Sequence, residues 1–142
     1  MPKIGKSAVG RPTVRLRATV EASELNAAAT TQSVALAQIP AGAIITQVFH
    51  EVPTLLADAG SISAVAMEGG TSGDPDYLIA ATSVFTGGNQ TRQSGAGTGV
   101  RVLPAAIDLV AKFTATGANF GNGTASDLDA GVVVITVLYQ VI

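Results

Sequence analysis

Cysteine and tryptophan are absent from this chain of 142 residues, histidine occurs once, and aromatic residues make up only 4% of the sequence. The lack of cysteine excludes disulfide bonds, zinc–thiolate sites and thiol nucleophiles. The single histidine, His50, excludes a multi-histidine metal site within one chain and would have to serve in any Ser-His-Asp triad. The sequence is therefore predicted not to encode an enzyme, although its ten acidic residues leave a glycosidase-like pair of carboxylates open.

Charged residues are also scarce, at 13% of the chain, whereas 47% of the residues are hydrophobic and most of these are aliphatic. A chain of this length forms one domain that buries about 70% of the surface exposed on unfolding. So few charges cannot cover the whole exterior. The composition therefore predicts that part of the surface is covered by other subunits or by a partner.

The charges that are present are separated along the chain. The first 17 residues contain five of the eight basic residues and no acidic one, so the remainder holds three basic residues against ten acidic ones. A basic arm of this kind attracts nucleic acid, a lipid surface or an acidic protein surface at long range, or is simply a solvated terminus. Its basic residues are Lys3, Lys6, Arg11, Arg15 and Arg17.

No hydrophobic segment has the character of a signal peptide or of a membrane span. The first twenty residues carry basic side chains where the apolar core of a signal peptide should lie. The longest apolar run, VVVITVLYQVI at residues 132–142, is short and contains Thr136 and Gln140. The sequence predicts neither a secretory signal nor a membrane partner.

Hydrophobicity with a period of two predicts strands. In PTVRLRATVE, residues 12–21, apolar side chains alternate with polar ones, which places Arg15 and Arg17 together on the outward face. Further β-rich runs, separated by glycine-rich turns, lie at residues 31–39, 44–52, 61–67, 99–103, 107–116 and 131–142. We predict an all-β antiparallel sandwich in one domain, residues 12–142, preceded by an extended basic arm, residues 1–11.

The stretch GGTSGDPDYLIAATSV, residues 69–84, raises the question of a metal site, because Asp74 and Asp76 flank Pro75. These residue types in this order also suit the N-cap and the first positions of a helix. A calcium loop would need several more oxygen ligands and usually a bidentate Glu. We therefore predict a short helical turn near residues 75–82, with no metal and no cofactor.

Two other segments contain residue types that can carry chemistry. His50 lies in a predicted strand, where it and Glu51 point to opposite faces, so we expect a surface or interface histidine rather than a general base. The GAGTG at residues 95–99 lacks the preceding buried strand and following helix of a phosphate-binding loop. Residues 86–99 are instead predicted to be a loop.

The C-terminal strand is apolar on both faces. A strand of this kind is expected to be central in the sandwich or covered by a neighbouring protomer. One face carries Val132, Val134, Leu138 and Ile142. The other face is taken as the predicted oligomer interface and carries Val133, Ile135, Val137, Tyr139 and Val141.

Three segments together resemble small virion proteins of tailed bacteriophages, above all capsid decoration or cement proteins. They are IPAGAIITQVFHEV at residues 39–52, GTSGDPDYLIAATSV at 70–84 and AGVVVITVLYQVI at 130–142. The resemblance implies a jelly-roll β-sandwich, usually a homotrimer, that binds the major capsid protein on the outer surface of the virion and stiffens the shell. It implies no catalytic residue, no cofactor, and no nucleic-acid or membrane partner.

The five basic residues of the N-terminal region are then expected to contact acidic patches of the shell. The main alternative is a tail or head fibre module that binds a receptor or a glycan. Such modules usually display aromatic stacking groups, whereas this chain has only Tyr77 and Tyr139 as phenol rings and no tryptophan. A small lytic enzyme is a third alternative.

Overall fold

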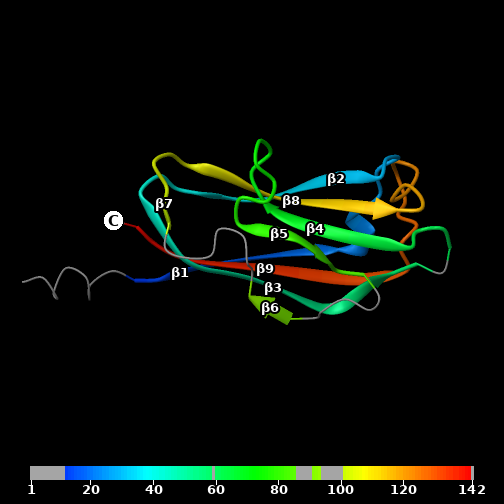
Figure 1. Cartoon of the computed structure of the whole chain (residues 1–142), viewed down its shortest axis with the longest axis horizontal. Helices are drawn as coiled ribbons and strands as arrows, with labels where there is room; N and C mark the ends of the chain where they lie inside the picture. The colour runs from blue at the N-terminus through cyan, green and yellow to red at the C-terminus, as the bar shows by residue number, and fades with distance from the viewer. Residues whose placement is uncertain (1–11, 59, 86–90, 94–100, 142) are drawn as a thin grey trace, which may run out of the picture.

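The computed structural model describes residues 12–58, 60–85, 91–93 and 101–141, and it folds them into two antiparallel sheets packed face to face (Figure 1). The strands are β1 (Val14–Glu21), β2 (Thr31–Ile39), β3 (Ala43–Ala57), β4 (Ala64–Gly70), β5 (Ile79–Ser83), β6 (Thr91–Gln93), β7 (Arg101–Val102), β8 (Ile107–Thr116) and β9 (Ala130–Val141). A single 3₁₀ turn, η1 (Ala22–Glu24), follows β1.

The strand order is that of a jelly roll. One sheet runs β1-β9-β3-β6, with β7 also pairing with β3, and the other runs β2-β8-β4-β5. β1 pairs with β9, β2 with β8, β3 with β6 and β4 with β5, as they would in one long hairpin rolled into two sheets. The prediction of an all-β, jelly-roll-like sandwich is confirmed.

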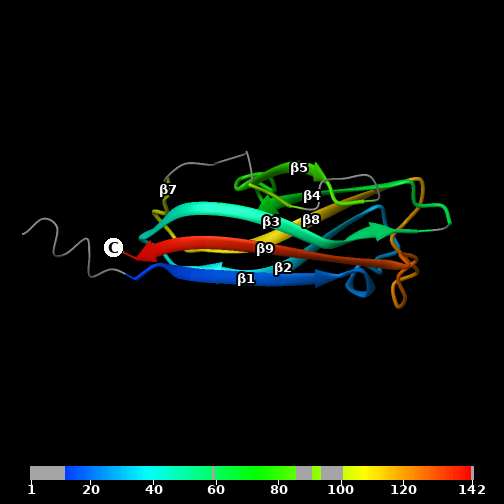
Figure 2. The ribbon, with the colours of Figure 1, turned by 90° about the horizontal axis from the view of Figure 1, so that it is seen from below.

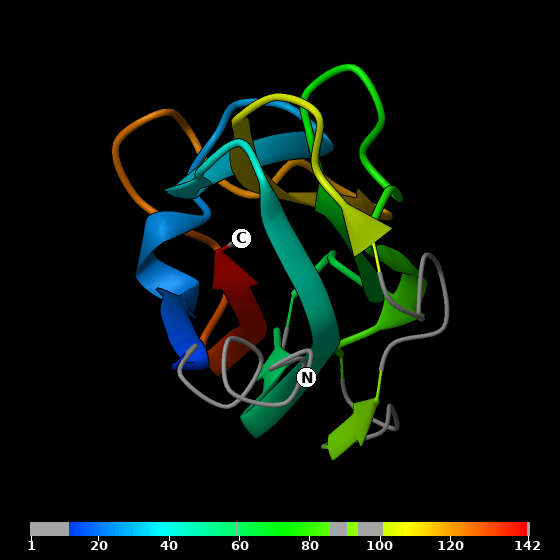
Figure 3. The ribbon, with the colours of Figure 1, turned by 90° about the vertical axis from the view of Figure 1, so that its left-hand side faces the viewer.

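The core lies between the two sheets, which appear as two layers when the molecule is viewed from the end where β9 finishes (Figure 3). Ile135 of β9 is fully buried on one side, and Met67 of β4 and Phe113 of β8 are fully buried on the other. Each side chain of this size contributes roughly 1.5–3 kcal/mol by leaving water. Because both sheets combine early and late segments of the chain, the core is closed only when β1, β8 and β9 are all in place.

β3 is longer than its predicted range, and its register is irregular. Against β9, the register shifts between Ile45 and Gln47 and again between Glu51 and Thr54. A bulge of this kind adds one residue and exchanges the faces of all the residues beyond it. Ile45 and Val48 therefore both face the core, where strict alternation would have turned Gln47 inward.

The predicted helical turn near residues 75–82 is wrong. Residues 75–76 form a turn, residues 77–78 are a bend, and Ile79–Ser83 are strand β5, which pairs with β4. The carbonyl of Asp74 accepts the N–H of Tyr77 at 3.1 Å, but the next N–H, that of Leu78, donates to Gly69 of β4 at 2.9 Å. Pairing with β4 thus ends the turn after one hydrogen bond, and tertiary context overrides the local helix signal.

The predicted loop regions are largely irregular in the described part of the chain. Residues 22–30, which connect β1 to β2, contain only η1 as regular structure. β6 is a strand of three residues inside the predicted loop at residues 86–99. The GAGTG at 95–99 lies outside the described residues, as does the predicted basic arm, residues 1–11.

Candidate contact surface

The predicted basic residues of β1 lie on the side of the β1-β9-β3 sheet that faces away from the other sheet, next to side chains of β9 and β3. Arg15 and Arg17 are exposed on β1, as the alternation predicts, while Lys3, Lys6 and Arg11 lie outside the described residues. We call this surface the outer face. Its residues are Arg15, Arg17, Thr19 and Glu21 of β1, Val132, Val134, Thr136 and Leu138 of β9, and Gln47, Phe49 and Glu51 of β3.

The middle of the outer face is largely buried within the single chain. In the strand register, Thr136 lies between Arg17 of β1 and Phe49 of β3. Thr136 is 1% exposed and Val134 3% exposed, although Val134 does not belong to the core cluster between the sheets. Leu138 and Phe49 are half-buried. The apolar contact area that the outer face offers beside its charges therefore comes from Leu138 and Phe49 rather than from Val134.

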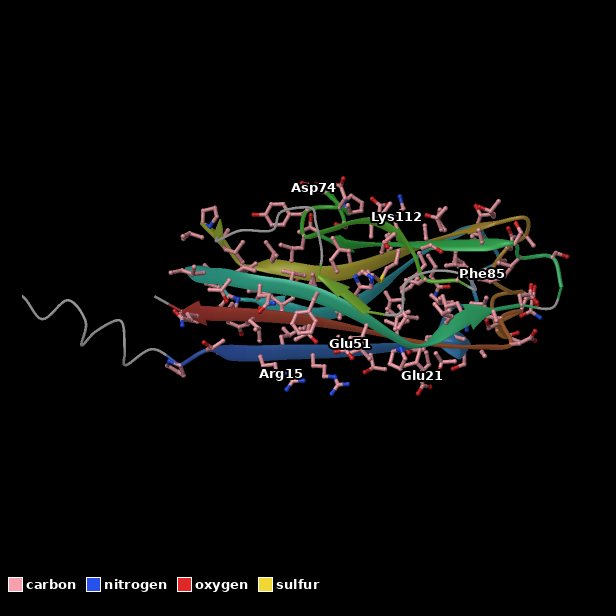
Figure 4. The ribbon with its side chains drawn as sticks, turned by 60° about the horizontal axis from the view of Figure 1, so that its bottom comes forward. Arg15, Glu21, Glu51, Asp74, Phe85 and Lys112 are labelled. Atoms are coloured by element: carbon pink, nitrogen blue, oxygen red, sulfur yellow. The ribbon has the colours of Figure 1, made fainter. Side chains whose placement is uncertain are left out.

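The charges on the outer face are segregated. Arg15 and Arg17 lie toward the start of β1 and Glu21 lies at its end, so that Arg15 and Glu21 mark opposite ends of the strand (Figure 4). Glu51 of β3 is on the level of Thr19, because both residues pair with Val134 of β9. One end of the face is therefore basic and the other acidic, which favours a partner with the reverse arrangement.

The predicted oligomer interface on the C-terminal strand requires correction. Val133, Ile135, Val137 and Tyr139 face the other sheet and are at most 8% exposed, within the protein's own core cluster. Only Val141, at the end of β9, is 44% exposed. The first four side chains are apolar because they pack in this core. β9 itself is central, between β1 and β3. This is one of the two positions expected for a strand with two apolar faces, the other being a strand covered by a neighbouring protomer.

His50 is in a strand, as predicted, but it is not a surface group. It is 1% exposed and lies opposite Ile135 of β9, on the core side of β3. The bulge between Ile45 and Gln47 explains this position, because without the extra residue His50 would face outward. Sequence alternation alone gave no sign of the bulge.

Asp74 and Asp76 lie in an exposed turn rather than at the start of a helix. The N–H of Asp74 donates to Oγ1 of Thr71 at 3.0 Å, and the N–H of Thr71 donates to the carbonyl of Asp74 at 3.0 Å. Within residues 12–58, 60–85, 91–93 and 101–141, no group of three or more His, Asp or Glu residues is placed to hold a metal ion. The turn has a clear structural role in joining β4 to β5.

A hollow of about 240 Å³ lies beside the connection between β3 and β4 and is lined by Asp58, Gly60, Ser61, Ala118 and Asp127. The carboxylate of Asp58 accepts the N–H of Gly60 at 2.7 Å and that of Ile62 at 2.9 Å. These bonds shape the turn between β3 and β4. Among the described residues, no helix has the length and hydropathy needed to cross a membrane.

Comparison with known proteins gives no match in sequence: no family model matches the chain, and no curated protein matches it. Solved structures do match in fold. A chain of the capsid asymmetric unit of cyanophage Pam1 superposes with a TM-score of 0.67 at 15% identity, covering 94% of this chain and 87% of that one.

A chain of the acidic stable capsid structure of Helicobacter pylori bacteriophage KHP30 superposes with a TM-score of 0.55 at 18% identity. The match covers 92% of this chain and 93% of that one. The likeness therefore extends over nearly the whole length of each partner. The fold is a jelly-roll sandwich of the kind present in these two phage capsid structures.

Proposed function

We propose that this protein is a structural component of a phage virion that binds the outer surface of the capsid and stabilises the shell as a decoration protein. The observation that carries the proposal is the fold match, which spans nearly the full length of chains from two phage capsid structures. The sequence supports it through the three segments that resemble decoration proteins. A role without catalysis is part of the proposal.

The proposed partner is the major capsid protein, and the proposed assembly is a homotrimer. A symmetric trimer matches local three-fold positions of a shell and multiplies weak contacts by avidity. The outer face supplies a half-buried apolar area around Leu138 and Phe49 for such contacts. Light scattering at micromolar concentrations tests the trimer, and a protein that remains monomeric throughout would argue against it.

In this proposal Lys3, Lys6, Arg11, Arg15 and Arg17 hold the protein to acidic patches of the shell. Arg15 and Arg17 are exposed side by side on one face of β1, which fixes their spacing. After Arg17 the chain carries only three basic residues but all ten acidic ones. The separation of charge would orient the domain as it approaches an acidic surface.

Deleting residues 2–11 tests the role of the arm. We expect the sandwich to remain folded, because β1 begins at Val14. Binding to undecorated capsids should weaken, and the remaining affinity should depend less on salt because three basic residues are lost. Co-sedimentation with capsids at increasing salt measures both quantities.

The matched control for this deletion changes Lys3, Lys6 and Arg11 to Gln in the full-length chain, which keeps the length of the arm and removes its charge. The same loss of affinity in both variants assigns the effect to charge. If the deletion variant binds with the affinity and salt dependence of the parent, the arm has no part in attachment.

The position of the protein in the particle tests the proposal as a whole. Imaging of intact virions should show hundreds of copies on the shell. A few copies at the tail would instead identify a tail or fibre module that binds a receptor or a glycan. A turnover assay on capsule or cell-wall glycans should give no product, and a product would revive the alternative of a lytic enzyme.

A further inference from the structure

β1 forms one edge of its sheet and runs along the margin of the molecule (Figure 2). In the described part of the chain, β9 is the strand that pairs with β1. Their register is unbroken from Val14 opposite Tyr139 to Glu21 opposite Val132. β1 contains no proline and no bulge, two of the features that prevent an edge from pairing with a further strand.

The open side of β1 carries the backbone groups of its odd-numbered residues. The N–H of Glu21 donates to Oε2 of Glu24 at 2.7 Å, so it does not point toward Val132 of β9. In an antiparallel pair, residues whose backbone groups point toward and away from the neighbour alternate. The N–H and C=O groups of Arg15, Arg17 and Thr19 therefore also point away from β9, toward the open edge, whereas the N–H of Glu21 is already bonded within the chain.

The sequence of β1 is complementary to itself when two copies run antiparallel. We propose that two copies of this chain pair through their β1 edges about a two-fold axis at Ala18. Arg15 then lies opposite Glu21 of the other copy, Leu16 opposite Val20 and Arg17 opposite Thr19, while Ala18 meets its own counterpart. The side chains of Arg15 and Glu21 then pair on the outer face, and Leu16 pairs with Val20 on the face toward the core. Backbone hydrogen bonds form between Arg17 of one copy and Thr19 of the other, and the sheets of the two copies become one continuous sheet.

Other registers fit less well. A shift by one residue would place the charged side chains of one copy on the same side of the joined sheet as the apolar side chains of the other copy. A shift by two residues in one direction places Arg17 opposite Arg17, which is repulsive. The same shift in the other direction centres the pair on Thr19 and shortens the overlap. The register at Ala18 joins the most residues without a like-charge pair.

This pairing is independent of the proposed attachment to a shell. A two-fold contact cannot lie within a three-fold trimer, so it joins two copies in solution or one trimer to the next. Leu16 and Ala18 are only partly buried in the single chain, as expected for residues beside an unfilled edge. The tests below use the purified protein without capsids, so they succeed or fail separately from decoration.

Oxidative cross-linking of single-cysteine variants tests the register, because the chain has no cysteine of its own. Ala18 would form a non-hydrogen-bonded pair with its counterpart, at a Cα separation of about 4.5 Å, which a disulfide can bridge. Ala18→Cys is expected to give a covalent dimer as its main oxidised product. Thr19→Cys, two residues out of register with itself, and Ser33→Cys, on exposed β2 of the other sheet, should remain uncross-linked.

Dimerisation through Thr19→Cys alone would overturn the register at Ala18, and the absence of a specific dimer in all three variants would overturn the pairing. A charge exchange provides the second measurement. Arg15→Glu places two like-charge pairs in each dimer and should weaken dimerisation at least about tenfold in sedimentation equilibrium. The double variant Arg15→Glu, Glu21→Arg should recover most of the loss. An unchanged dimer in Arg15→Glu, or a double variant as weak as the single one, would contradict the proposal.

Discussion

Gly70, the last residue of β4, packs against the β4–β5 turn and admits no side chain. A Cβ atom there would overlap the carbonyl oxygen of Asp74 and would lie 2.7 Å from the backbone nitrogen of Tyr77. Both are backbone atoms, which cannot move without opening the turn. Gly73, in the same turn, has nothing within 4 Å of the corresponding position.

These two glycines give a matched pair of substitutions. Gly70→Ala should lower the free energy of unfolding by about 1–3 kcal/mol, because the added methyl group displaces backbone. Gly73→Ala should change it by less than about 0.5 kcal/mol. Urea denaturation of both variants measures the difference. Equal losses at the two positions would mean that the turn differs from the one described.

The same turn shows why a local signal can mislead. Asp74, Pro75 and Asp76 have the residue types of a helix start, and the sequence offers no local reason to reject one. The competing structure depends on Gly69, whose carbonyl accepts the N–H of Leu78 across the turn. That hydrogen bond links β4 to the residue just before β5, so it cannot be predicted from the sequence of residues 74–82 alone.

At the scale of a single element, the two apolar faces of β9 differ in how deeply they are buried. Ile135 is fully buried against the other sheet, and Leu138 is half-buried on the outer face. Ile135→Ala should cost about 2–5 kcal/mol of unfolding free energy, because it leaves a cavity in the core. Leu138→Ala should cost roughly 1 kcal/mol or less, because its site is partly open to water.

Thermal or urea unfolding, together with light scattering, checks this prediction. The face of β9 with Val133, Ile135, Val137 and Tyr139 was first expected to contact a neighbouring protomer. If that expectation were right, Ile135→Ala would dissociate an oligomer while leaving the stability of the protomer unchanged. A larger stability loss at Leu138 than at Ile135 would place the core on the opposite face.

Several elements could be predicted because their hydrophobic pattern is regular. The predicted ranges 31–39 and 107–116 coincide with β2 and β8, and the alternation in β1 placed Arg15 and Arg17 on the exposed face. β6 was missed because three residues are too few to show a period. The orientation of His50 was missed because the bulge in β3 is set by its pairing with β9.

The acidic part of the outer face was also beyond the reach of sequence. Glu51 is 34 positions after Arg17 and comes near β1 only because β9 lies between β1 and β3. The signal that could have pointed to this surface is the apolar character of both faces of residues 132–142. This apolar character predicts that the strand is central, but it does not predict which strands lie on either side of it.

At the scale of the whole molecule, the fold depends on contacts between distant parts of the chain. β9 pairs with both β1 and β3, so the sheet containing them cannot form without it. Removing residues 130–142 should therefore abolish cooperative unfolding, whereas removing residues 2–11 should not. Circular dichroism with thermal melting checks both truncations, and a cooperative melt of the C-terminal truncation would contradict this reading. Folding should be slow, in milliseconds to seconds, because nonlocal pairs must form first.

The pairing of Val14 with Tyr139 brings residues 12 and 141 to the same end of the sandwich. A reporter or peptide fused after the end of β9 would thus begin near residue 12, where the described part of the chain starts. The opposite end is less suited to carry a foreign peptide. There Asn122 Oδ1 accepts the N–H groups of Thr124 and Ala125 at 3.0 and 2.8 Å, and the N–H of Gly123 donates to the carbonyl of Asn26 at 2.8 Å. A foreign epitope inserted between residues 123 and 124 would separate Asn122 from the two N–H groups that it accepts and should destabilise this turn, so the end of β9 is the better position for display.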